Sequence, residues 1–177
     1  MIDPVAAWLA RLALAGVFAS AALHKWRDLD AFAGAVAAHR LVPEATTRPL
    51  ACALAACESA IAVALLVSAS APFAAGAAAA LLALYTGAIA INLARGRRDI
   101  DCGCAGAAAR QSLSGWLVLR NLLLAAALGA TLAPASARVL GTFDLFTIAL
   151  GAGALYALYA ASNVLFAYAP RTKALLG

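Results

Sequence analysis

Residues Phe73–Ala94 read FAAGAAAALLALYTGAIAINLA and contain no charged side chain. A helix needs about 20 predominantly apolar residues to cross the hydrocarbon core of a bilayer, and this stretch supplies them. Similar stretches occupy Val5–Leu23, Thr47–Ala69, Leu113–Ala133 and Phe143–Ala169. Because 66% of the 177 residues are hydrophobic and only 12% are charged, we predict one all-α integral membrane domain, residues 1–177, formed by a bundle of about five transmembrane helices.

The first apolar stretch resembles a secretory signal peptide in length but differs from one at both ends. Asp3 stands where a signal peptide has basic residues, and the apolar run continues into His24-Lys25-Trp26 without a small-residue cleavage site. We therefore predict a retained first span.

The connection from His24 to Thr46 predicts a short helix at the membrane interface between spans one and two. Asp28 or Asp30 can cap such a helix, and Pro43 ends it. Phe32, Val36 and His39 fall between them at helical spacing. We expect both histidines, His24 and His39, to be solvated or to face lipid.

Basic residues sort by side once five spans are assigned, which argues for topology signals rather than for nucleic-acid binding. Arg138 alone lies on one side. The other side carries Lys25, Arg27, Arg40, Arg48, Arg95, Arg97, Arg98, Arg110, Arg171 and Lys173. The positive-inside rule then predicts a multi-pass protein of a bacterial-type inner membrane, with the N-terminus outside and the C-terminus in the cytoplasm.

The third connection carries Cys102-Gly103-Cys104 among arginines and glycines. A basic surrounding favours the thiolate, which is the nucleophile in thiol–disulfide exchange, and Gly103 gives the backbone freedom to bring two thiols together. We therefore favour a redox pair over two alternatives, a soft-metal site and a fixed disulfide. Cys52 and Cys57 lie about 140° apart around one helix, so they serve either as packing residues or as a relay that exchanges with the Cys102/Cys104 pair.

Polar side chains inside the predicted spans gather at the depth of the cysteine loop. An ionisable side chain in a membrane normally faces the bundle interior and has a partner, and we predict a pair between Glu58 and Arg120. The pair either locks two helices together or lines a polar pocket, in which Arg120 lowers a thiol pKa or Glu58 moves a proton. The other members of this predicted pocket are Asn92, Asn121, Asn163, His24 and Lys25.

Three tyrosines occur at helical spacing with asparagines: Tyr85 with Asn92, and Tyr156 and Tyr159 with Asn163. They either pack or anchor the helices at the interface, or they line a quinone slot. No other cofactor is predicted.

Several motifs resemble the MauE/DoxX group of redox-associated membrane proteins, and in particular its MauE branch. They are AALHKWRD at 21–28 followed by Phe32 and RLVP at 40–43, Glu58 inside the second span, and Asn92-Leu93 leading through RGRR at 95–98 to DCGC at 101–104, with Arg120-Asn121 beyond. Ala105 stands where this group leads us to expect an aromatic residue. The resemblance implies a partner of thioredoxin-like proteins in making or rearranging disulfides of exported proteins.

We therefore predict a membrane thiol–disulfide oxidoreductase or redox partner that uses Cys102 and Cys104. It would exchange electrons with a thioredoxin-like protein or an exported client. The competing classes are a soft-metal-ion transporter for Cu(I) or Hg(II) with cysteine ligands, and a non-catalytic assembly subunit with a structural disulfide. The positive-inside rule places the Cys102/Cys104 pair on the cytoplasmic side, where stable disulfides are unusual. Three explanations stay open: the pair is reached from within the membrane, it draws electrons from cytoplasmic thiols, or this loop does not follow the charge rule.

Overall fold

The computed structural model describes residues 2–103, 111–134, 136 and 138–176, with residues 168–176 described by their backbone only. The helices are α1 (Pro4–Arg27), α2 (Leu29–Ala38), the 3₁₀ turn η1 (Glu44–Thr46), α3 (Thr47–Leu65), α4 (Ala71–Ala94), α5 (Gly115–Ala130) and α6 (Thr142–Leu176). In this part of the chain the only strand-like pairing is one bridge between Asp101 and Ser112. The predicted all-α class is confirmed.

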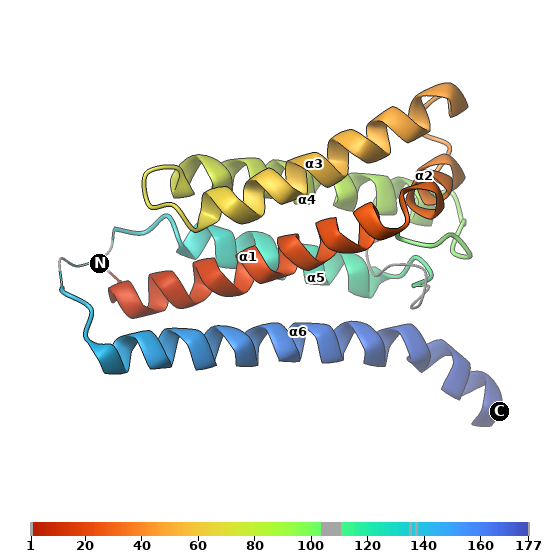
Figure 1. Cartoon of the computed structure of the whole chain (residues 1–177). Coiled ribbons are helices and arrows are strands. Elements are labelled where there is room, and N and C mark those ends of the chain that lie inside the picture. The colour runs from red at the N-terminus through yellow and green to blue at the C-terminus, as the bar shows by residue number, and fades with distance from the viewer. Residues whose placement is uncertain (1, 104–110, 135, 137, 177) are drawn as a thin grey trace.

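The five longer helices run side by side, and α2 lies across one end of the bundle (Figure 1). That end also carries the connection from α4 to α5 and the C-terminus. The N-terminus, the turn between α3 and α4, and the connection from α5 to α6 lie at the opposite end (Figure 1). The end that carries α2 therefore also carries the described basic residues Lys25, Arg27, Arg40, Arg48, Arg95, Arg97 and Arg98, and the opposite end carries Arg138, as the sequence predicts. The orientation of the bundle in the membrane stays a prediction.

Among the residues that the structure describes, four segments are long and apolar enough to cross a membrane: Pro4–Arg27, Glu44–Leu65, Ala71–Ala94 and Thr142–Ala167. The predicted fourth span, Leu113–Ala133, is shortened to the 16 residues of α5, about 24 Å of helix. Its first residues join the preceding loop, because the amide of Leu113 donates to the carbonyls of Arg98 and Ile100.

The helix α3 also ends before the predicted Ala69. After Leu65 the chain turns, and the hydroxyl of Ser70 donates to the carbonyl of Ala64 at 2.9 Å. This bond adds a side-chain donor to a carbonyl of the last helical turn, to which the amide of Val67 also donates at 3.3 Å. α3 and α4 thus form an antiparallel hairpin that is joined by this turn (Figure 1).

The predicted interfacial helix is confirmed as α2. Its N-cap is Asp28, whose Oδ1 accepts from the amide of Ala31 at 3.0 Å. Phe32 and Ala33 are buried against the ends of the long helices. Alanines pack the bundle itself closely, since Ala51, Ala55 and Ala78 are completely buried, and small residues allow helices to approach in lipid.

The far end of the bundle is closed by Arg138. Its guanidinium donates to Asp144 at 2.8 Å and to Asp3 at 3.2 Å, which joins the start of α1 to the start of α6. The amide of Val5 and then Arg138 lower the pKa of Asp3 below its usual value. The main-chain amide of Ile2 also donates to the carbonyl of Pro134 at 2.9 Å.

The end of α1 is joined to the middle of α3 by a buried ion pair. The ammonium of Lys25 donates to Glu58 Oε1 at 2.8 Å, and both side chains are only 2% exposed. The hydroxyl of Tyr85, from α4, donates to the same oxygen at 2.8 Å. The Lys25 ammonium also lies 4.9 Å from the ring centre of Phe32 and 5.5 Å from that of Tyr85. One carboxylate therefore connects α1, α3 and α4, and the cation contacts α2.

This pair corrects the predicted partnership of Glu58 with Arg120. Sequence spacing gives the depth of a residue along its helix but not which neighbouring helix it faces. α3 begins beyond the end of α1 (Figure 1), so Glu58 is level with the last turn of α1. Arg120 instead donates to the side chains of Asn121 and Asn163.

We predict that Glu58→Gln lowers the free energy of unfolding by about 3–5 kcal/mol, because it leaves the buried Lys25 ammonium without a countercharge. The measurement is reversible unfolding in mixed detergent micelles. The matched control is Asp30→Asn, which breaks the pair with Arg48 at 3.5 Å between side chains that are 78% and 70% exposed. That change should cost less than about 1 kcal/mol. Equal, small effects of the two substitutions would contradict a stabilising role for the buried pair.

Candidate thiol site and adjoining cavity

The loop that contains Cys102 is closed at its base by main-chain hydrogen bonds. The amide of Cys102 donates to the carbonyl of Gln111 at 2.9 Å. Asp101 Oδ1 accepts from the amides of Gly103 at 3.1 Å and Gln111 at 3.3 Å. The Asp101 carboxylate therefore binds the backbone of the loop and holds the turn in which the first thiol stands. Cys104 and Arg110 lie outside the described residues.

Gly103 is required at its position for two independent reasons. Its φ is +70°, a left-handed conformation that side chains with a Cβ rarely adopt. A Cβ added there would also lie 3.0 Å from Phe32 Cδ2 and 3.2 Å from Ala35 Cβ. The residue between the two cysteines thus packs directly on α2, so the glycine does more than supply the backbone freedom that we predicted.

A second contact between the loop and α2 comes from Arg97. Its guanidinium donates to the carbonyls of Ala38 at 2.9 Å and His39 at 3.3 Å, the last carbonyls of α2. It also donates to Asn92 Oδ1 at 3.0 Å, and Asn92 is fully buried at the end of α4. Arg97 therefore caps α2 and fixes it to α4, whereas Arg95 and Arg98 are exposed.

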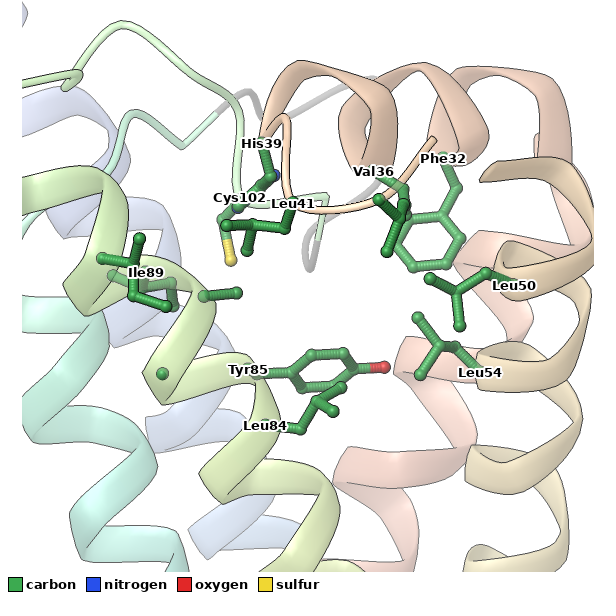
Figure 2. A pocket seen from close by; sticks show the side chains of 14 residues that line it. Phe32, Val36, His39, Leu41, Leu50, Leu54, Leu84, Tyr85, Ile89 and Cys102 are labelled. Atoms are coloured by element: carbon green, nitrogen blue, oxygen red, sulfur yellow. The ribbon is translucent and has the colours of Figure 1, made fainter. Parts of the chain in front are cut away.

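Cys102 is buried, with 8% of its surface exposed, and lines a cavity between α2, α3 and α4. The volume is about 330 Å³, within the range of small-molecule sites. Figure 2 shows the sulfur of Cys102 pointing into this space, with the ring of Tyr85 across from it. The other lining residues are Phe32, Val36, His39, Leu41, Val42, Leu50, Leu54, Leu84, Gly87, Ala88, Ile89 and Ile91.

The position of His39 differs from the sequence prediction. We expected it to be solvated or to face lipid, but it is half-buried and lines the same cavity as Cys102. Its Nδ1 lies 2.9 Å from the carbonyl oxygen of Ala35. The helical spacing of Phe32, Val36 and His39 was the available signal, since all three line the cavity. The sequence alone does not show that the cysteine loop folds over that face of α2.

His24, in contrast, is exposed at the end of α1 as expected. It lines a smaller cavity of about 40 Å³ beside Lys25, Asp101 and Gly103. Two of the predicted pocket residues, His24 and Lys25, therefore lie beside the described start of the cysteine loop, at Asp101 and Gly103.

Three of the predicted pocket residues, Arg120, Asn121 and Asn163, form a separate cluster between α4, α5 and α6. Arg120 Nη1 donates to Asn163 Oδ1 at 3.0 Å, and Arg120 Nη2 donates to Asn121 Oδ1 at 3.2 Å. Asn121 then donates to the hydroxyl of Thr86 at 3.2 Å. Gln111, at the base of the loop, donates to the carbonyl of Asn163 at 2.6 Å. This cluster ties α4, α5, α6 and the loop together, and its residues are not among those that line the cavity of Cys102.

The three tyrosines do not share one slot. Tyr85 lines the cavity with Cys102, but Tyr156 and Tyr159 are not among its lining residues. The ring of Tyr156 faces Gly16 of α1. The ring of Tyr159 lies 5.9 Å from the guanidinium carbon of Arg120.

Cys52 and Cys57 carry free thiols on α3, the first half-buried and the second exposed. The cavity wall receives Leu50 and Leu54 from α3 rather than either cysteine. The predicted relay therefore has no place in the wall of this cavity. In the described ranges, no group of three or more His, Cys, Asp or Glu side chains is arranged to hold a metal ion.

The fold and the site together define a class: a multi-pass helical membrane protein whose cysteine loop is packed over one end of the bundle. The family model of methylamine utilisation protein MauE matches residues 3–134, which span α1 to α5. The chain belongs to the MauE family. This identification confirms the resemblance seen in the sequence.

Curated relatives extend the similarity. MauE of Paracoccus denitrificans is 45% identical over 126 residues, which cover 71% of this chain and 68% of that protein. MauE of Paracoccus versutus is 42% identical over 164 residues, 92% of this chain and 88% of that protein, so the similarity reaches into α6. MauE of Methylorubrum extorquens is 43% identical over 146 residues, covering 82% and 78% of the two chains. No solved structure matches the chain.

We predict that Gly103→Ala destabilises the loop more than Gly96→Ala does. Both glycines have positive φ, +70° and +73°, but an added Cβ meets Phe32 and Ala35 only at Gly103, while nothing lies within 4 Å at Gly96. Both variants should lose about 1–2 kcal/mol for the left-handed conformation. Gly103→Ala should lose about 1–3 kcal/mol more through overpacking.

The measurement is thermal unfolding of the two purified variants, together with the rate of Cys102 alkylation. Gly103→Ala should also accelerate alkylation, because the loop is pushed off α2. Identical behaviour of the two variants would show that the contact with Phe32 has no part in placing the loop.

Proposed function

We propose that this protein is a membrane thiol–disulfide redox protein of methylamine utilisation, in which Cys102 and Cys104 exchange electrons with a thioredoxin-like protein or an exported client. The main observation in support is the placement of Cys102 in a loop that Gly103 and Arg97 hold to α2. A thiol fixed in position beside a cavity is suited to repeated reaction. The family's description as methylamine utilisation proteins supports the assignment of the process.

The exchange needs two steps. The thiolate of one cysteine attacks a sulfur of the partner's disulfide, which forms a mixed disulfide and releases one partner thiolate. The second cysteine then attacks its neighbour's sulfur in the mixed disulfide. The bond between Cys102 and Cys104 forms, the second partner thiol leaves, and two electrons have passed from the pair to the partner. The reverse sequence oxidises the partner.

The sequence leaves three explanations for a cysteine pair at the cytoplasmic end of the bundle. The buried position of Cys102 supports the first of them, access to the pair from within the membrane. The sulfur points into a cavity among the helices, which favours access from within the membrane. In this proposal the thioredoxin-like partner reaches the pair at the end of the bundle. The second redox partner of the pair, with which it exchanges the same electrons, reaches it through the cavity.

The test is formation of a mixed disulfide with a purified thioredoxin whose resolving cysteine is replaced by serine. The oxidised full-length protein should capture this thioredoxin through Cys102 or Cys104. Cys57→Ser is the matched control and should capture it equally, since that exposed thiol lies outside the pair. The double variant Cys102→Ser/Cys104→Ser should capture none.

Two outcomes would contradict the proposal. A pair that stays fully oxidised in mild reductant and captures nothing would indicate a structural disulfide. A reduced pair that captures nothing but is protected from maleimide by added Cu(I) or Hg(II) would indicate a soft-metal transporter.

A further inference from the structure

The wall of the cavity beside Cys102 extends to the surface of the bundle. Three of its lining residues are exposed at the surface of the bundle, Leu84 at 56%, Ile91 at 44% and Leu41 at 39%. Leu84 and Ile91 belong to α4, which is long and apolar enough to span a membrane. Since lipid surrounds such a helix, a ligand would enter between these side chains from the acyl-chain layer. A lipid-soluble molecule meets this condition.

Three of the side chains that line the cavity carry polar atoms. They are the thiol of Cys102, the imidazole of His39 and the hydroxyl-bearing ring of Tyr85. The carbonyl of Ala35 can only accept, so His39 Nδ1 carries the hydrogen of their 2.9 Å bond. In the neutral ring Nε2 is then an acceptor. The sulfur of Cys102 and an imidazole that can accept a proton therefore line one apolar space.

Tyr85 contributes a fixed aromatic wall. Its hydroxyl donates to Glu58 at 2.8 Å, so the ring is held in place by the buried ion pair with Lys25. Figure 2 shows this ring facing the end of the cavity where Cys102 and His39 lie. Aromatic rings prefer offset stacking on other flat rings. The wall thus suits a planar ligand.

We propose that this cavity binds the ring of a lipid-soluble quinone, which takes the electrons of the Cys102/Cys104 pair. The proposal rests on the proposed thiol–disulfide function and adds the electron acceptor. The volume of about 330 Å³ accommodates a substituted single ring but not a folded peptide. Tyr85 supplies the stacking wall and His39 accepts the thiol proton.

The reaction is balanced by the quinone alone. Two S–H bonds break and one S–S bond forms between Cys102 and Cys104. The two electrons and two protons released go to the quinone, whose two carbonyl groups become hydroxyl groups. His39 Nε2 receives the proton of Cys102 and passes it to the nearer quinone oxygen. The pair is then oxidised and ready to oxidise a thioredoxin-like partner.

The test fills the cavity from a position where added volume is tolerated. Gly87 lines the cavity, and a Cβ added there meets nothing within 4 Å. Gly76 lies on the same helix, also meets nothing within 4 Å, and is outside the cavity. Gly87→Leu and Gly76→Leu are therefore a matched pair, purified as full chains in nanodiscs with the thiol pair reduced.

The readout is anaerobic oxidation of the pair by ubiquinone-1, followed by quinone absorbance and thiol mass labelling. Exchange with oxidised thioredoxin is measured on the same samples. Gly87→Leu should slow the quinone reaction at least ten-fold and leave the thioredoxin reaction unchanged, while Gly76→Leu should change neither. His39→Gln should slow the quinone reaction with little change in the quinone concentration at half-maximal rate.

Two results would overturn this inference. In the first, the wild type exchanges with thioredoxin but does not reduce ubiquinone-1, and the proposed function stands without the quinone. In the second, Gly87→Leu reacts with ubiquinone-1 as fast as Gly76→Leu does, which places the reaction outside the cavity. Failure of both wild-type reactions would instead contradict the proposed function itself.

Discussion

The ion pair between Lys25 and Glu58 is the interaction on which the rest of this arrangement depends. Placing either charge alone in a membrane helix costs several kcal/mol, so each residue requires the other. Their contact, 2.8 Å between Lys25 Nζ and Glu58 Oε1, fixes the end of α1 against the middle of α3. The same carboxylate holds the hydroxyl of Tyr85, and the same ammonium lies over the ring of Phe32. Both aromatic rings lie next to the cysteine loop or to the cavity that Cys102 lines.

Phe32 and Tyr85 carry the effect of this pair to the thiol site. Phe32 is the surface on which Gly103 packs, and Tyr85 is a wall of the cavity that Cys102 enters. Arg97 adds a second attachment by capping α2. The loop is therefore fixed by three kinds of contact: a close packing at a glycine, a charge-assisted cap, and a main-chain closure at Gln111. Together these contacts turn Cys102 inward.

Much of this fold is predictable from sequence because its governing interactions are local. Hydropathy along the chain is sufficient for the long spans, and Asp28 with Pro43 marks the ends of the segment that contains α2. The partner of Glu58 is not predictable in this way. It depends on how far α3 extends beyond α1 and on the rotation of each helix, which spacing does not specify. Our assignment to Arg120 failed for that reason.

The candidate site shows the same division. Cys102, Gly103 and Cys104 are recognisable from their spacing and their basic surroundings. The role of His39 is not, because it arises when a loop more than 50 residues away in sequence, as the contact from Arg97 shows, folds over α2. Likewise Tyr85, Tyr156 and Tyr159 share helical spacing with asparagines but belong to different surroundings. Side-chain neighbours across the bundle decide their roles.

The quinone proposal requires that Cys102 face a cavity that opens to the bilayer. The most direct measurement is alkylation of Cys102 as the sole cysteine, after Cys52→Ser, Cys57→Ser and Cys104→Ser, in proteoliposomes. Neutral N-ethylmaleimide is compared with a charged maleimide, each rate normalised to that of glutathione. The reference is Ser112→Cys, at an exposed position, in a chain otherwise without cysteine. We predict at least a ten-fold greater preference for the neutral reagent at Cys102 than at the reference. Equal preferences at the two positions would contradict it.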